Sequence, residues 1–139
     1  MILNQITLPC TEETFRSCLE FYQALGLVLI VHTHDAYARF ECPVDETGAP
    51  PSTLSLHVVD GPLPPSEARA VIYLETEDPR ADVERLGALG IAIGDAVEQR
   101  WLWTEAPLTD PAGNPIKIYQ AGENRRFPPW RRPPRIGRQ

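Results

Sequence analysis

The sequence predicts an α+β fold made of two tandem βαβββ modules. Strand and helix patterns follow one another in the same order in both halves, and the halves share residues at constant spacing. Residues 20–27 (EFYQALGL) match residues 84–91 (ERLGALGI) at an offset of 64, and residues 54–57 share the hydrophobic phase of residues 116–119 at an offset of 62. Because so short a repeat cannot bury its own strand face, we expect the two copies to pack around one core.

The first half reads strand, helix, strand, strand, strand. Apolar and polar residues alternate over 3–9, as in a strand, and Thr11 is predicted as the N-cap of a helix with Glu12 and Glu13 in its first turn. Apolar residues then recur at helical spacing until Gly26, which ends the helix. Three strands follow, with a loop expected over 43–52; they cover residues 27–33, 37–42 and 53–59.

The second half repeats this order after a module boundary in residues 61–68, which contain three prolines. A strand is expected over 70–76. Asp78 is predicted to cap a helix with Pro79 at its first position, and the helix runs to Leu89 with Gly90 as its stop. The last three strands are predicted at residues 92–97, 101–108 and 115–120.

Charge divides the chain into an acidic body and a basic tail. The formal net charge is −6, but residues 121–139 hold six arginines and one acid, which gives +5 there and leaves −11 on residues 1–120. An acidic body repels phosphates, so we expect no nucleic acid partner. The Arg/Pro-rich tail, residues 123–139, is expected to be extended, with Phe127 and Trp130 anchoring it to the body or to a second copy of the chain.

Composition points to a cytoplasmic protein without a membrane segment. The longest apolar run, residues 25–31, is far shorter than the ~20 residues that cross a bilayer, and residues 1–5 lack the features of a signal peptide. Cys10, Cys18 and Cys42 are odd in number and form no Cys-x-x-Cys pair, which argues against a disulfide framework or a zinc knuckle. Walker, Gly-x-Gly-x-x-Gly and Gly-x-Ser-x-Gly motifs are also missing.

Three segments resemble the vicinal oxygen chelate superfamily, which includes glyoxalase I, extradiol dioxygenases and the bleomycin- and fosfomycin-resistance proteins. They are the opening strand at residues 3–9 (LNQITLP), the helix end at 21–27 (FYQALGL) and the turn at 108–114 (LTDPAGN). The resemblance implies one glyoxalase-like domain over residues 1–122, with modules at about 1–61 and 68–122. It also implies that the eight strands form one cupped mixed sheet. The fold hosts several chemistries, so the resemblance names no reaction.

Members of this superfamily generally hold one divalent metal with ligands from four strands. Gln5 matches the first ligand position, but Ser55 and Val71 stand at the second and third, and Lys117 stands where a glutamate is expected. A protonated lysine cannot ligate a metal, and its charge opposes a nearby cation. The family's metal site is therefore expected to be degraded in this chain.

A shifted metal site stays open as an alternative. Gln5, His57 and Glu75 can share the face of the cup, and amide, imidazole and carboxylate ligands suit a divalent ion. Otherwise His57 is a polar residue on a half-buried strand and Glu75 is solvated. His32 and His34 also share a strand face, but next to Asp35 they indicate the end of that strand at a turn.

Aromatic and charged side chains supply the other pocket candidates. Trp101, Trp103 and Glu105 alternate on one face, which suits an aromatic or cationic ligand, although core or dimer-interface packing explains the indoles equally well. Tyr37, Arg39 and Glu41 form a similar alternating set in the first module. Lys117 and Tyr119 can act as acid and base or as an anion clamp; alternatively, Lys117 pairs with Glu105 or Glu75 without catalysis.

Two functions remain. The first is a glyoxalase-like enzyme acting on a small oxygenated metabolite, with Lys117, Glu105 and Tyr119 as catalytic candidates. Its candidate ligand-binding residues are Gln5, His57, Glu75, Trp101, Trp103 and Arg39. The alternative is a non-catalytic binding protein of the bleomycin-resistance type, for a cationic or aromatic small molecule. In both cases a homodimer is expected, since two helices cover only one face of such sheets.

Overall fold

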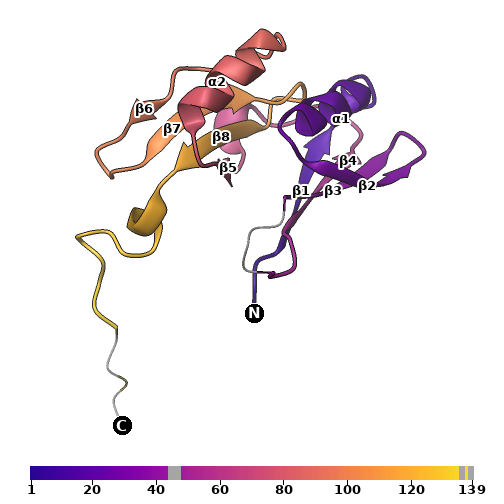
Figure 1. The fold of residues 1–139 in the computed structure, drawn as a ribbon. Helices are drawn as coiled ribbons and strands as arrows, with labels where there is room; N and C mark the ends of the chain where they lie inside the picture. Colours follow the sequence, from indigo (N-terminus) through magenta and orange to yellow (C-terminus); the bar gives the residue numbers. More distant parts are fainter. Residues whose placement is uncertain (44–47, 135–136, 138–139) are drawn as a thin grey trace.

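The computed structural model describes residues 1–43, 48–134 and 137, and its elements fall into two βαβββ modules (Figure 1). The first module contains β1 (Gln5–Cys10), α1 (Phe15–Ala24), β2 (Val28–Thr33), β3 (Tyr37–Glu41) and β4 (Thr53–Val58). The second contains β5 (Ile72–Glu75), α2 (Pro79–Ala88), β6 (Val97–Glu98), β7 (Thr104–Thr109) and β8 (Pro115–Gln120). Two 3-10 turns, η1 (Ser66–Ala68) and η2 (Gly122–Arg125), flank the second module.

The two modules have the same topology. The eight strands are divided between two four-stranded sheets, with orders β1-β4-β3-β2 and β5-β8-β7-β6. In each sheet the first and last strands of the module pair in parallel and the other neighbours are antiparallel. The bounds of α1 and α2 differ by 64 residues and those of β4 and β8 by 62, the offsets seen in the sequence. The predicted α+β fold of two tandem modules is confirmed.

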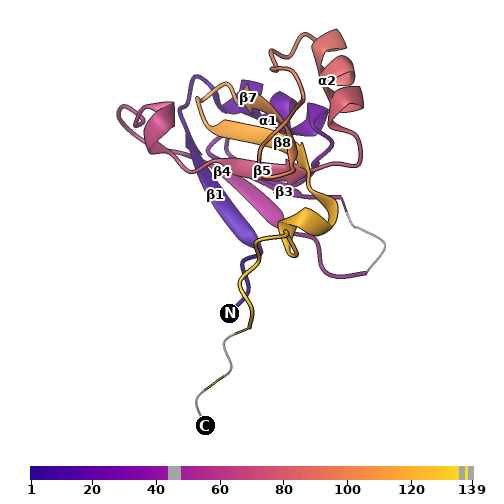
Figure 2. The same ribbon diagram turned by 90° about the vertical axis from the view of Figure 1, so that its left-hand side faces the viewer.

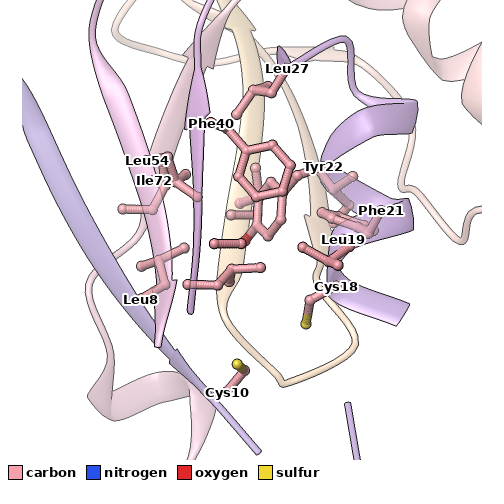
Figure 3. Close-up of a cluster of buried hydrophobic side chains, with 14 of the residues drawn as sticks. Leu8, Cys10, Cys18, Leu19, Phe21, Tyr22, Leu27, Phe40, Leu54 and Ile72 are labelled. Atoms are coloured by element: carbon pink, nitrogen blue, oxygen red, sulfur yellow. The ribbon is translucent and has the colours of Figure 1, made fainter. Parts of the chain in front are cut away.

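One face of each sheet packs against the helix of its module, and both helices lie on the same side of the molecule (Figure 1). The core between these layers is apolar, and Figure 3 shows the part of it around α1. Its members include Leu8, Phe15, Tyr22, Phe40, Leu54, Ile72, Leu86 and Ile116. The opposite face of each sheet has no covering helix and is called the open face below. Polar and aromatic side chains gather there.

Strand register makes the positions of the two modules comparable. Leu8 pairs with Leu56 in the first module, and Leu74 pairs with Ile118 in the second. With β8 following β4 at an offset of 62, β5 therefore follows β1 at an offset of 66. Val71 thus corresponds to Gln5, and Lys117 corresponds to Ser55.

Helix α1 begins later than the sequence predicts. Its N-cap is Thr14, not Thr11, and Glu12 and Glu13 precede the helix. Thr11 and Thr14 bind each other instead, since the Thr11 amide donates to Thr14 Oγ1 at 3.1 Å. In α2 the prediction is confirmed, because the Asp78 side chain accepts from the Ala81 amide at 3.1 Å and Pro79 opens the helix.

The hairpin between β6 and β7 also differs from the prediction. The strand expected over 92–97 is reduced to β6 and an isolated bridge between Ile93 and Leu108. Trp101 and Leu102 lie in the turn, so β7 begins at Thr104 and not at 101. Leu102 has φ of 71°, a left-handed conformation that interrupts the strand alternation. Of the loop predicted at 43–52, residues 44–47 lie outside the described residues; the remainder is irregular.

A buried polar network joins the modules. Tyr22 of α1 donates its hydroxyl hydrogen to Asp110 Oδ2 at 2.6 Å, and Asn114 donates to the carbonyl oxygen of Pro9 at 2.9 Å. Asp110 also accepts hydrogen bonds from the amides of Ala112 and Asn114 and from the Asn114 side chain. Burial, followed by the charge of Asp110, raises the pKa of Tyr22 far above its usual range, so the phenol stays a donor. This network holds the β7–β8 turn against the first module.

The chain after β8 leads away from both modules (Figures 1 and 2). Phe127 and Trp130 are 58% and 57% exposed, so the prediction that they anchor the tail to the chain's own body is wrong. Arg126 and Arg131 lie over the Phe127 ring instead, at 5.3 and 4.4 Å from its centroid. Over the described part of the chain, neither helix has the length and apolar character needed to span a bilayer.

Candidate functional site

The open face of the second module carries a cluster of three aromatic side chains. Trp103 stacks on Tyr119 with 4.9 Å between ring centroids, and Tyr73 meets both rings edge-on at 5.7 and 5.4 Å. The strands β5 and β8 position Tyr73 and Tyr119, while Trp103 precedes β7 and donates its indole hydrogen to the carbonyl oxygen of Asn124. Tyr73 is 40% exposed, so part of this aromatic cluster is open to a ligand.

An ion pair lies beside the aromatic cluster. Lys117 Nζ is 2.9 Å from Glu105 Oε1, and Trp101 Nε1 donates to Glu105 Oε2 at 2.6 Å. Glu105 is only 2% exposed, whereas the Lys117 side chain is 32% exposed. Lys117 Nζ also lies 5.6 Å from the centroid of the Tyr73 ring. Of the two partners anticipated for Lys117, the structure selects Glu105.

These contacts leave the catalytic candidates poorly suited to proton transfer at neutral pH. The hydrogen bond to Glu105 raises the pKa of Lys117, which keeps the lysine protonated and therefore unable to act as a base. Burial raises the pKa of Tyr119, which keeps the phenol neutral. Both oxygens of Glu105 are engaged by donors. At neutral pH this part of the site therefore presents a lysine cation, a neutral phenol and a buried carboxyl group with both oxygens hydrogen-bonded.

The first module has a different arrangement at the equivalent positions. Tyr37 and Ser55 share a 2.8 Å hydrogen bond between their hydroxyl groups, and Arg39 donates to the Tyr37 hydroxyl at 2.8 and 3.0 Å. The bond with Ser55, followed by that with Arg39, lowers the pKa of Tyr37 below its usual range. Glu41 lies further along β3, opposite Thr53. This open face is polar and lacks an aromatic cluster among its described residues.

The four positions at which the superfamily binds its metal do not fit a divalent ion here. Lys117 is engaged in the ion pair and Val71 has no donor atom. The Ser55 hydroxyl is bound to Tyr37, and the side-chain oxygen of Gln5 accepts from Thr53 at 3.2 Å. One neutral amide oxygen and one hydroxyl oxygen cannot offset the electrostatic repulsion between a divalent cation and the nearby Lys117 ammonium group. Within residues 1–43, 48–134 and 137, no three His, Cys, Asp or Glu side chains are grouped as metal ligands.

The shifted metal site is not assembled either. Gln5 pairs with Thr53, and His57 lies four residues further along β4, which separates them by about 13 Å along the strand direction. Glu75 and Gln5 both line a cleft of about 960 Å³ at the seam between the modules, but His57 does not. His32 binds Asp35 at 2.7 Å, and His34 and Asp35 form the β2–β3 turn, as the sequence indicated.

Tyr73 is the site residue that sequence reasoning missed. It stands two residues before Glu75 and two after Val71, so it shares their strand face and could have been found from that alternation. Its role depends on Trp103 and Tyr119 from two other strands, which the sequence alone did not bring together.

Comparisons with known proteins agree with this fold. A family model described as a glyoxalase-like domain matches residues 5–119. No curated protein matches the chain. Solved structures with the same fold include the lactoylglutathione lyase of Agrobacterium tumefaciens, at 16% identity and a TM-score of 0.65, over 86% of this chain and 92% of that one.

Two antibiotic-binding proteins are also similar. One is a bleomycin-binding protein in complex with bleomycin, at 20% identity and a TM-score of 0.63, over 86% of this chain and 98% of that one. The other is TnmS3, an antibiotic-binding protein from Streptomyces sp. CB03234, at 27% identity and a TM-score of 0.63, over 87% and 96%. With a family model over most of its length and this fold, the chain belongs to the glyoxalase-like domain family of the vicinal oxygen chelate superfamily.

Proposed function

We propose that the protein binds a small planar aromatic molecule on the open face of its second module, without a divalent metal. The observation that carries this proposal is the aromatic cluster of Tyr73, Trp103 and Tyr119 beside an ion pair at the family's metal position. Aromatic rings favour offset-stacked or edge-on contact with another ring, and each such contact contributes about 0.5–1.5 kcal/mol beyond its buried area.

Binding without catalysis is favoured over the glyoxalase-like enzyme. Lys117 is protonated, Tyr119 is neutral and Glu105 is buried with both oxygens engaged, so the three catalytic candidates offer no free base. The antibiotic-binding neighbours support the same choice, although at 20–27% identity they serve as an analogy. Turnover of lactoylglutathione, the compound named in the lyase neighbour, would contradict it.

The three tryptophans of the chain provide the test, because only two of them lie at the site. In ¹⁵N-labelled protein titrated with 2-naphthamide, a neutral planar probe, we expect the indole N–H signals of Trp101 and Trp103 to shift in parallel. The signal of Trp130, in the tail, serves as an internal control and should stay in place. A titration that moves none of the three signals, or Trp130 alone, would refute the proposal.

A matched pair of variants sharpens the test. Trp103→Leu should weaken 2-naphthamide binding by about tenfold, which corresponds to the loss of one aromatic contact. Trp130→Leu removes an equally large but remote side chain and should leave the affinity unchanged. Equal affinities for both variants and the wild type would place the probe elsewhere.

We also infer a homodimer in which a second copy covers the open face of the first module and leaves the aromatic cluster of the second module accessible. The first-module face carries exposed apolar side chains, including Val28 at 55% and Ile30 at 44%, which helix α1 does not shield. Self-association is a common way to bury such a face. Light scattering at micromolar concentration should give twice the chain mass of 15.6 kDa. A measured mass equal to that of the monomer would contradict the homodimer.

A further inference from the structure

Lys117 is the part of the ion pair that a ligand on the open face can reach. Glu105 is 2% exposed and both of its oxygens accept hydrogen bonds, one from Lys117 and one from Trp101. Lys117 is 32% exposed. Of this ion pair, a molecule resting on the aromatic cluster therefore meets the Lys117 ammonium group and not the Glu105 carboxylate.

The ammonium group retains donor capacity. A protonated lysine has three N–H donors. Glu105 accepts one hydrogen bond from Lys117 at 2.9 Å, and the Tyr73 side chain, whose ring centroid lies 5.6 Å from the same nitrogen, also interacts with the ammonium group. The carboxylate also holds the nitrogen in position, so little side-chain freedom is lost when a further acceptor binds.

We propose that the Lys117 ammonium serves as the fixed positive group of this site, in the place where relatives hold a metal, and that the ligand is a planar aromatic anion carrying a carboxylate or phenolate oxygen. This inference rests on the proposed function and adds the charge of the ligand to it. Charge-assisted hydrogen bonds are about twice as strong as neutral ones, so an anionic oxygen gains more from Lys117 than an amide oxygen does. The exposed carboxylate on this face is Glu75, which pairs with Tyr119 in register and whose charge acts on that phenol, so a cationic ligand held by Glu75 is the competing outcome that the probes below test.

Three probes of one shape separate the alternatives: 2-naphthoate, 2-naphthamide and 2-naphthylmethylammonium. In the same indole N–H titration of the full chain, we expect 2-naphthoate to bind about tenfold more tightly than 2-naphthamide, and the ammonium probe to bind most weakly. Lys117→Arg should keep this order, since a guanidinium also donates to a carboxylate. High salt should reduce the preference.

Removing the ammonium requires a variant that still folds. Lys117→Met alone leaves the Glu105 carboxylate buried without its cation, so the double variant Lys117→Met/Glu105→Gln is used, in which a neutral amide can still accept from Trp101. In this variant we expect naphthoate and naphthamide to bind equally. Circular dichroism confirms that the variant is folded before the titration.

The outcomes distinguish this inference from the function on which it rests. Equal binding of all three probes to the wild type, or a preference for 2-naphthylmethylammonium, overturns the inference and leaves the aromatic site standing. A naphthoate preference that persists in the double variant also overturns it. If no probe shifts the indole signals of Trp101 and Trp103, the proposed function fails and the inference fails with it.

Discussion

On the open face of the first module, Tyr37 of β3 and Ser55 of β4 are diagonal neighbours, and a 2.8 Å hydrogen bond joins their hydroxyl groups. In the second module the equivalent side chains are Glu105 and Lys117, joined by an ion pair at 2.9 Å. The strands that carry them have the same order and the same register. A shared fold therefore places two groups at the same spacing in both halves, and residue type alone decides whether they form a hydroxyl pair or an ion pair.

The connections between the last two strands of each module differ as well. In the second module β7 and β8 are joined by the short turn at Asp110–Asn114, which the buried carboxylate of Asp110 organises. In the first module the connection between β3 and β4 is longer. The Asp110 carboxylate thus constrains this end of the second module, and the Tyr22 hydroxyl of the first module depends on the same carboxylate.

The largest effect is expected from Asp110→Ala. The substitution leaves the Tyr22 hydroxyl, two backbone amides and the Asn114 side chain without their acceptor, and each buried unsatisfied group costs about 1–3 kcal/mol. We expect a loss of at least about 4 kcal/mol in the free energy of unfolding, measured with urea. Ser52→Ala in the first-module connection, where the side chain is exposed, should change it by less than about 0.5 kcal/mol. Similar losses for both variants would show that the Asp110 network does not stabilise the protein.

The next largest difference in the free energy of unfolding is expected between substitutions in the two diagonal pairs, Glu105–Lys117 and Tyr37–Ser55. Lys117→Met leaves a buried carboxylate without its cation and should cost about 3 kcal/mol, at the low end for such changes because Lys117 is partly exposed. Ser55→Ala removes one neutral hydrogen bond and should cost about 1 kcal/mol, since the Tyr37 hydroxyl keeps Arg39. Urea unfolding measures both. If Ser55→Ala is the more damaging change, the contrast between the modules is wrong.

Alkaline pH is expected to weaken the first module before the second. Burial raises the pKa of Cys10 to about 11 and that of Cys18 to about 12, from 9.0. The unfolded chain therefore releases these protons first, so their stabilisation is complete below pH 9 and is lost as pH rises toward 12. The hydrogen bond with Glu105 raises the pKa of Lys117 from 10.5. The contribution of Lys117 to stability is therefore lost only above pH 10.5.

Urea unfolding from pH 7 to pH 10 should give a constant stability up to about pH 8.5 and a fall above pH 9. Cys18→Ala, compared at each pH with the wild type, should flatten that fall. An unchanged slope in the variant would mean that the thiols do not titrate as their burial requires.

The smallest effect concerns the hairpin turns. Leu102 in the β6–β7 turn has φ of 71°, a conformation that costs a non-glycine residue about 1–2 kcal/mol, so Leu102→Gly should raise the free energy of unfolding by about 1 kcal/mol. His34 in the β2–β3 turn also has a positive φ, at 51°, but histidine tolerates this conformation better than leucine does. His34→Gly should therefore raise the free energy of unfolding by less. Thermal melts of the two variants provide the comparison; a larger gain for His34→Gly would contradict it.

Much of the fold could be predicted from the sequence because the helix ends and the final strands repeat at fixed offsets. The duplicated segment around Gly26 and Gly90 predicted two helices that the structure confirms. Local signals failed where tertiary contacts compete with them. Thr11 has the composition of an N-cap but binds Thr14, and Trp101 alternates like a strand residue but lies in a turn at Leu102.

The candidate site was only partly predictable for the same reason. Glu105 and Lys117 were anticipated as partners, because strand phase puts them on one face, and the structure joins them. The aromatic cluster needed the relative order of β5, β8 and β7, which a single sequence does not give. The Tyr22–Asp110 hydrogen bond joins residues 88 positions apart and crosses the module boundary, so no local sequence pattern predicts it.

The central claim is that the position of the family's metal ligand now carries a fixed lysine cation. Elemental analysis of the full chain, purified without chelators and then exposed to nickel, zinc, iron and manganese salts, tests it most directly. The account predicts far less than one bound ion per chain for every metal, in the wild type and in Gln5→Ala alike. One tightly bound ion per chain, lost in Gln5→Ala, would contradict it.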